Sequence, residues 1–216
     1  MPRSRGPAVL TLVVGLAAAT TLTAFGVWRP SATDPGAGAS QPPATSSPTA
    51  RVDLSTLPVG RTLDCEWLAE DDVQVALGAA VSSQDSYVSG DRVEVAEGVR
   101  DVVHEDGCVF RASSSEARVW VHAAPVSTAA ATDLVRGAGR AQGCSVVAAS
   151  TRFGDPGVTD VCTASGSRST TATMRGLFGD AWLSCSLEVE GSSAADVRAR
   201  AERWCTQVAA TLGAAG

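Results

Sequence analysis

The uncharged stretch Ala8–Trp28 limits what this chain can fold into more than any other feature. As a helix of roughly 20 residues it is long enough to cross the ~30 Å apolar core of a bilayer. Arg3 and Arg5 precede it, so the positive-inside rule predicts residues 1–7 in the cytoplasm and the rest of the chain outside. The sequence therefore predicts a single-pass transmembrane signal-anchor at residues 8–28.

A cleaved signal peptide is the alternative interpretation of the same stretch. Such a peptide has an apolar core of about 7–15 residues followed by a small-x-small cleavage site. Here the apolar run is longer, and the best such site, Ala37–Ala39, lies far downstream. We favour the uncleaved anchor in the cell membrane; cleavage would instead give a secreted protein.

The region that follows divides into a spacer and one domain. Residues 29–60 are rich in Pro, Ser, Thr, Ala and Gly, a composition typical of a disordered linker. Residues 61–216 are long enough for a single domain that buries roughly 70% of its unfolded surface. We therefore expect one extracytoplasmic domain at 61–216, held away from the membrane by the linker.

The charge of this domain excludes some partners. Residues 61–216 contain 13 arginines and 21 acidic residues, a net charge of −8. Nucleic acids and anionic lipid headgroups need a basic surface, so neither is an expected partner. The partners expected are the membrane, through the N-terminal helix, and an unknown ligand or protein of the cell envelope.

Hydrophobic periodicity predicts an α+β fold for the domain. Runs of strands with short connections alternate with three helices, which favours a twisted antiparallel sheet with helices mainly on one face. Asp106-Gly107 is expected to be a turn, and residues 82–98 a polar loop with a short strand at Arg92–Val95. The predicted helices are Glu70–Gly78, Ser127–Arg140 and Ser193–Leu212, and the predicted strands are Val99–His104, Cys108–Ala112, Ala117–Ala124, Cys144–Ala149, Val161–Ala164, Thr170–Leu177 and Trp182–Glu190.

Six cysteines lie in the domain, and none forms a C-x-x-C pair. An even number of cysteines outside the cytoplasm indicates three disulfides, for which fifteen pairings are possible. A hairpin turning at Phe153 would bring two of them together, and a bridge from the last strand to the last helix would use two more. We predict sequential pairing, with a Cys65–Cys205 bridge as the main rival: Cys65–Cys108, Cys144–Cys162 and Cys185–Cys205.

Several short motifs of Cys, Trp and Gly together resemble a known family. They are Asp64–Leu68 (DCEWL), Gly107–Phe110 (GCVF), Phe153–Gly157 (FGDPG), Arg175–Cys185 (RGLFGDAWLSC) and Trp204-Cys205. The pattern resembles small actinobacterial cell-envelope proteins, many of them lipoproteins, that share a domain of unknown function. It is also loosely similar to the extracellular sensor domain of PknH-type mycobacterial kinases. The chain differs in having no lipobox cysteine and no kinase domain, and the family supplies no catalytic residues to transfer.

Few residues qualify as functional candidates. The motifs G-x-S-x-G and H-E-x-x-H are absent, so the sequence predicts no catalytic residue, no metal site and no cofactor. His122 shares a strand face with Trp120, where it either lines a ligand groove or lies at a covered edge. Trp182 is expected to be exposed beside a turn and to contact a ligand or partner. Trp67 and Trp204 are expected in the core.

Three functions remain open at this point. The first is a non-enzymatic, membrane-tethered domain that binds a ligand or partner in the bacterial cell envelope. The second is a structural or accessory subunit of an envelope complex, which would expose an apolar patch. The third is a hydrolase of unrecognised type, with a catalytic triad assembled from scattered residues.

The anchor predicts the mass of the mature protein. If Ala8–Trp28 is an uncleaved signal-anchor, the protein purified from bacterial membranes retains Leu10 and has the mass of the full chain, 21.9 kDa. Intact-mass spectrometry measures this directly. A mature chain that begins downstream of residue 28 would show a released domain instead.

Overall fold

The computed structural model describes residues 52–96, 98–163, 166 and 168–215. The predicted anchor at 8–28 and linker residues 29–51 lie outside the described residues. Within the described ranges, no helix is both long enough and apolar enough to cross a membrane.

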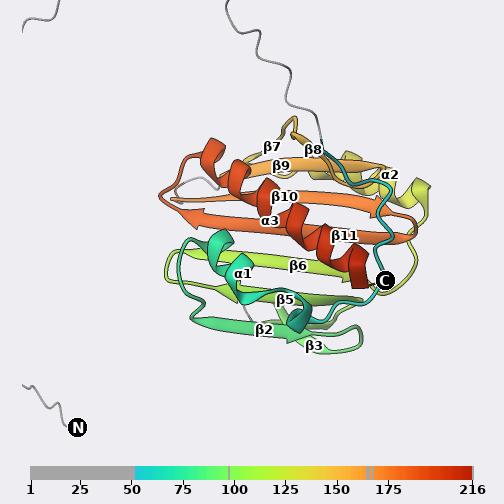
Figure 1. Ribbon diagram of the computed structural model, residues 1–216, viewed down its shortest axis with the longest axis horizontal. Coiled ribbons are helices and arrows are strands. Elements are labelled where there is room, and N and C mark those ends of the chain that lie inside the picture. The colour runs from blue at the N-terminus through green and yellow to red at the C-terminus, as the bar shows by residue number, and fades with distance from the viewer. Residues whose placement is uncertain (1–51, 97, 164–165, 167, 216) are drawn as a thin grey trace, which may run out of the picture. The chain divides into compact units, whose positions relative to one another are not determined.

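A seven-stranded antiparallel sheet forms the centre of the domain, and the predicted α+β fold is confirmed (Figure 1). Its strand order is β2-β5-β6-β11-β10-β9-β7. The pairs β5–β6, β9–β10 and β10–β11 follow each other along the chain, whereas other segments intervene between β2 and β5, between β6 and β11, and between β7 and β9. The strands are β2 (Ser83–Tyr87), β5 (Glu105–Arg111), β6 (Ser115–His122), β7 (Cys144–Val146), β9 (Gly157–Thr163), β10 (Ser169–Phe178) and β11 (Ala181–Glu190). Two short pairs lie apart from this sheet: β1 (Val52–Asp53) with β8 (Thr151–Arg152), and β3 (Arg92–Ala96) with β4 (Val99–Val102).

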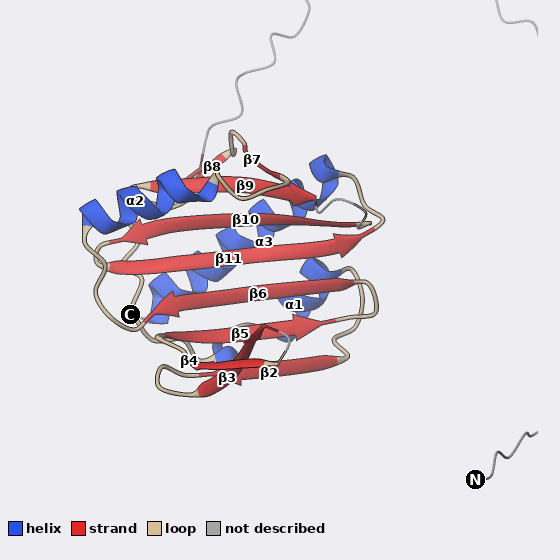
Figure 2. Cartoon of the chain, turned by 180° about the vertical axis from the view of Figure 1, so that it is seen from behind, coloured by secondary structure: helices blue, strands red, loops and turns tan. Residues whose placement is uncertain are grey.

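Two helices pack on one face of the sheet and one on the other. The long helix α3 (Ala194–Ala215) runs diagonally across the central strands beside the short helix α1 (Glu70–Leu77), whereas α2 (Thr128–Ala138) lies on the opposite side (Figures 1 and 2). The main core lies under α3, where alternate strand residues meet the apolar stripe of the helix. These core residues include Met174, Leu183, Leu187, Val197, Trp204, Val208 and Leu212.

The ends of the helices follow local rules. Three acidic residues occupy the first turn of α1, where their negative charges interact favourably with the helix dipole. Gly78 ends this helix with a left-handed φ of 69°. The Ser127 side chain caps α2 by accepting a hydrogen bond from Ala130 N, 3.2 Å away. The predicted end of the last helix at Leu212 is too early: Gly213 stays helical beside Leu57, and α3 continues to Ala215.

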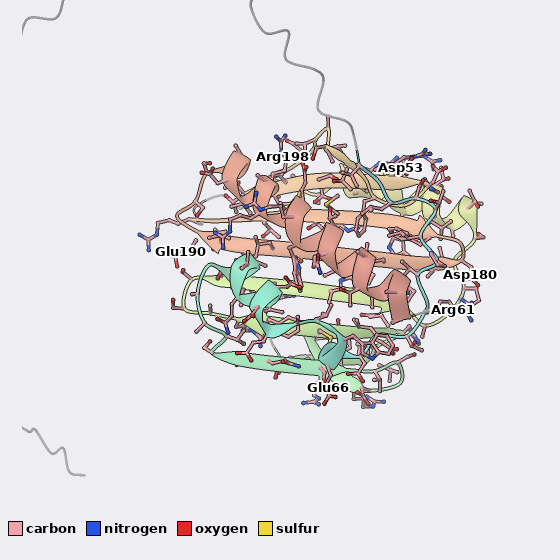
Figure 3. The ribbon with its side chains drawn as sticks, viewed as in Figure 1. Asp53, Arg61, Glu66, Asp180, Glu190 and Arg198 are labelled. Carbon is pink, nitrogen blue, oxygen red and sulfur yellow. A yellow bond between two sulfur atoms is a disulfide. The ribbon has the colours of Figure 1, made fainter. Side chains whose placement is uncertain are left out.

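The domain begins earlier than the predicted boundary at residue 61. Val52–Asp53 pairs with Thr151–Arg152 in parallel, and Leu54 and Val59 are 8% and 6% exposed in the main core. Arg61 then forms an ion pair with Asp180 at the β10–β11 turn (Figure 3). Leu54 and Val59 are isolated apolar residues in a polar segment, and both are buried in the main core. Residues 52–60 therefore belong to the domain rather than to the linker.

Two further predictions for the middle of the chain are wrong. Residues 83–87 form the edge strand β2, although a run of polar side chains gives no strand periodicity. Asp106-Gly107 lies inside β5 instead of forming a turn. The Tyr87 ring lies over Gly107, where an added Cβ would be 2.2 Å from Tyr87 Cζ, so this strand position needs glycine.

The three disulfides pair the cysteines in sequential order, as predicted: Cys65–Cys108, Cys144–Cys162 and Cys185–Cys205. The second joins directly opposite residues of β7 and β9, and the third ties the central strand β11 to α3. Each closes a loop of tens of residues, which by the chain-entropy model adds roughly 3 kcal/mol to stability.

Two glycines of the fold predict opposite responses to alanine. A Cβ at Gly176 would lie 2.0 Å from the Phe153 carbonyl oxygen, so Gly176→Ala should lower the free energy of unfolding by about 3 kcal/mol. A Cβ at Gly137, within α2, meets nothing within 4 Å, so Gly137→Ala should raise it by roughly 0.5–1 kcal/mol. Urea unfolding followed by tryptophan fluorescence measures both. Equal stability of the two variants would contradict the packing of residues 153–157 on β10.

Candidate functional site

The sheet face opposite α3, here called the open face, is the largest surface left for function. Helix α2 covers only its β9–β10 end, while the β3–β4 hairpin lies at the β2–β5 end (Figure 2). The strand register sets which side chains lie on it, because directly opposite residues share a face. One row consists of Val158, Arg175, Ser184, Trp120, Gly107 and Tyr87, and the next of Val146, Asp160, Thr173, Ser186, Arg118, Val109 and Asp85.

Helix α2 buries the end of the open face where Trp182 lies, and the sequence predicted that Trp182 would be exposed. Its Ala131 forms a small apolar cluster with Leu177 and Trp182, and Trp120 packs against this cluster. Trp182 is 1% exposed, so the prediction that it contacts a ligand is wrong. The sequence shows that Trp182 points away from the main core, but not that a helix from elsewhere in the chain covers it.

A cavity of about 400 Å³ lies between α2 and residues 146–159. Most of its lining side chains are apolar, and one ion pair, Arg152–Asp155 at 2.9 Å, provides charge. Apolar walls with a few polar groups are typical of small-molecule sites. The lining residues are Val135, Val146, Val147, Ala148, Ala149, Thr151, Arg152, Phe153, Gly154, Asp155, Gly157, Val158 and Thr159.

The loop that forms one wall of this cavity is fixed to the sheet. Phe153 is buried edge-to-face against Phe178, with ring centroids 5.1 Å apart. Asp155 N donates to Leu177 O at 2.8 Å, and Leu177 N donates to Pro156 O at 3.0 Å. The cavity wall is therefore held in place before any ligand arrives.

The preceding residues are anchored on the other side, to α3. Glu202, 9% exposed, accepts a hydrogen bond from Ser150 N at 3.2 Å and another from the Ser150 hydroxyl. This pair holds the chain next to Ala148 and Ala149, which line the cavity. This chain segment is therefore anchored at Ser150 and again at Asp155 and Pro156. These contacts within the fold fix the wall of the cavity.

A buried ion pair flanks the cavity on the open face. Asp160 is 1% exposed and pairs with Arg175, and their direct neighbours across the strands are the cavity residues Val146 and Val158. Burial raises the pKa of Asp160, and Arg175 offsets part of this rise. Cys144 and Cys162 lie close enough to Asp160 to suggest a metal site, but their sulfurs are bonded to each other and cannot supply thiolates.

Three aromatic side chains form a second feature of the open face, here called the aromatic corner: Tyr87, Trp120 and His122. Trp120 and His122 share a strand face as predicted, and their rings meet edge-on at 87° with centroids 5.5 Å apart. All three keep part of their surface exposed. Burial and the charge of Glu105 raise the pKa of Tyr87.

The remaining tryptophans and histidines add no second cluster. Trp204 lies in the main core as predicted, but Trp67 is 41% exposed, so its expected core position is wrong. Among the described residues, neither His104 nor His122 forms an imidazole hydrogen bond to a serine hydroxyl or a carboxylate. A histidine that activates a nucleophile needs such contacts.

Two comparisons of the sequence, with family models and with curated proteins, return no match. No protein-family model matches the chain, and no curated protein matches it in sequence. The likeness to actinobacterial envelope proteins therefore stays a resemblance of short motifs.

The Asp160–Arg175 pair predicts a pH-dependent stability. Because the folded pKa of Asp160 lies above its unfolded value of 3.8, its protonation favours the fold, and this contribution is lost as pH rises through the folded pKa. Arg175→Met should remove the compensating charge, steepen this loss, and lower stability at neutral pH by roughly 3 kcal/mol. Urea unfolding from about pH 4 to 8 measures the slope.

Two variants control this experiment. Adding Asp160→Asn to Arg175→Met should remove the part of the slope that Arg175→Met adds, because the buried carboxylate at position 160 is then gone. Arg168→Met breaks the ion pair between Arg168 and Glu190, whose side chains are 83% and 43% exposed respectively. It should lower the free energy of unfolding by less than about 1 kcal/mol. If Arg175→Met behaves like Arg168→Met at every pH, Asp160 is not the charge that Arg175 compensates.

Proposed function

We propose that this protein is a non-enzymatic, membrane-tethered domain that binds a ligand in the bacterial cell envelope through its open face. The observation that carries the proposal is the cavity between α2 and residues 146–159, whose walls are anchored to β10 and α3. A volume of about 400 Å³ is within the range of small-molecule sites.

The location supports the proposal independently. Three disulfides, with no free cysteine among the described residues, indicate an oxidising, extracytoplasmic compartment. The positive-inside rule applied to Ala8–Trp28 assigns the domain to the same side of the membrane. A tethered domain there meets envelope components at high local concentration.

The walls of the cavity suggest the chemistry of its ligand. Val135, Val146 and Val158 offer an apolar surface, while Arg152 and Asp155 offer one donor and one acceptor group at the loop. These charges already neutralise each other, so a ligand with an apolar body and a polar, uncharged end fits the site best.

Site-specific photo-crosslinking tests the proposal in the full-length chain. A benzophenone amino acid replaces Val146, which lies at the cavity and is 56% exposed, and in a matched control it replaces Val75, which lies on α1 and is 73% exposed. In irradiated bacterial membranes, the residue-146 variant should acquire a small, non-protein adduct that mass spectrometry detects, and the residue-75 variant should not.

The other outcomes separate the alternatives. A protein adduct specific to residue 146 would favour an accessory subunit of an envelope complex and overturn small-ligand binding. Equal adducts at both positions, or none at residue 146, would show that the cavity is not a binding site.

A further inference from the structure

The aromatic corner combines ring surface with unused hydrogen-bonding atoms. Among the described residues, Trp120 Nε1, the Tyr87 hydroxyl and the His122 ring nitrogens form no hydrogen bond, and all three side chains are partly exposed. Trp204 Nε1, by contrast, is buried without a partner inside the core. The corner therefore offers donors and acceptors that a bound molecule can reach.

Glycine at position 107 creates the space for this corner. In the sheet register, Gly107 lies directly between Tyr87 on β2 and Trp120 on β6, and all three positions share the open face. The Tyr87 ring extends over Gly107 because no side chain stands there. Tyr87 and Trp120, from strands that are not neighbours, thus flank one glycine on the same face of the sheet.

The charges around the corner are largely paired. Arg118 binds Glu116, which also binds Arg111, and Arg111 binds Asp85 at the far end of the network. Glu105, directly opposite His122, has no arginine within ion-pair distance among the described residues. A polyanion would meet this carboxylate and an acidic domain, so an uncharged ligand is the best electrostatic match.

We infer that the aromatic corner binds a pyranose ring of a neutral saccharide. The C–H face of a sugar ring carries a slight positive potential and packs on the negative face of an aromatic ring. Its hydroxyls both donate and accept, which matches Trp120 Nε1, the Tyr87 hydroxyl and the Glu105 carboxylate. This inference rests on the proposed function in one respect, that the open face is the binding surface.

A nucleobase is the main competitor for a stacking site, but it fits less well. Single-stranded nucleic acids need a basic groove along their phosphates in addition to stacking rings. The strands beside the corner carry Glu105, Glu116 and Asp85 together with their arginines, so the backbone of a nucleic acid would be repelled as often as attracted.

Calorimetric titration of the full-length chain in phosphatidylcholine vesicles tests the inference. The probes are cellotriose, maltotriose and N-acetylated chitotriose. At least one should bind, and Trp120→Ala should weaken binding by about tenfold or more. The matched control Trp67→Ala removes a tryptophan that is 41% exposed and lies outside the corner, and should change binding by less than about twofold.

Two gentler variants guard against a folding effect. Trp120 also packs against the α2 cluster, whereas Tyr87→Phe removes only a hydroxyl and His122→Gln replaces a partly exposed imidazole ring with a polar amide. Each should weaken binding a few-fold while leaving the free energy of unfolding unchanged. Binding that survives all three corner variants would overturn the inference.

The titration and the crosslinking experiment distinguish a failure of the saccharide inference from a failure of the proposed function. If the wild-type chain binds none of the three trisaccharides, the saccharide inference is wrong, whatever residue 146 crosslinks to. If a trisaccharide binds and depends on Trp120 while residue 146 gains no adduct, the corner is a binding site and the cavity is not.

Discussion

The register between β10 and β11 is the constraint on which both faces of this domain depend. Ten residue pairs join the two strands, and the Gly179-Asp180 turn sets their alignment, with Gly179 at a left-handed φ of 64°. A slip of one residue would exchange the faces of a whole strand. In the observed register Leu183, Cys185 and Leu187 meet α3, while Ser184 and Ser186 line the open face.

The Cys185–Cys205 bridge secures this arrangement, because it joins the middle of β11 to the middle of α3. The apolar side chains of one face are thereby held against a helix that runs across the central strands (Figure 1). The shorter α2 covers only one end of the other face (Figure 2). Unequal helix cover, imposed by one strand register, is why the domain has an open face at all.

The sequence predicted the features that depend on local pattern. The stripe Val197, Trp204, Val208 and Leu212 predicted α3, and the alternation in residues 182–190 predicted β11. The disulfides followed from strand and helix positions. The cavity could not be predicted, since Val135 and the 146–159 segment are brought together only by tertiary packing.

Features that lack periodicity were missed for the same reason. The polar edge strand β2 has no apolar alternation, so its position became clear only from its pairing with β5. Its Tyr87 completes the aromatic corner, yet no pattern links Tyr87 to Gly107 and Trp120. For Trp182, strand alternation gave the correct face but could not show what covers that face.

The exposed ion pairs of the open face contribute little to stability, and this bears on the role of that face. In its ion pair Arg111–Asp85 both side chains are more than a third exposed, and in Arg118–Glu116 the arginine is 54% exposed. Exposed ion pairs are typically worth about 0–1 kcal/mol. Stability comes instead from the core under α3 and from the disulfides. Asp160–Arg175 is the exception, since there a buried carboxylate depends on its partner. Tyr87 and His122 remain partly exposed beside these weakly stabilising ion pairs and outside the buried α2 cluster, so recognition explains their position better than packing does.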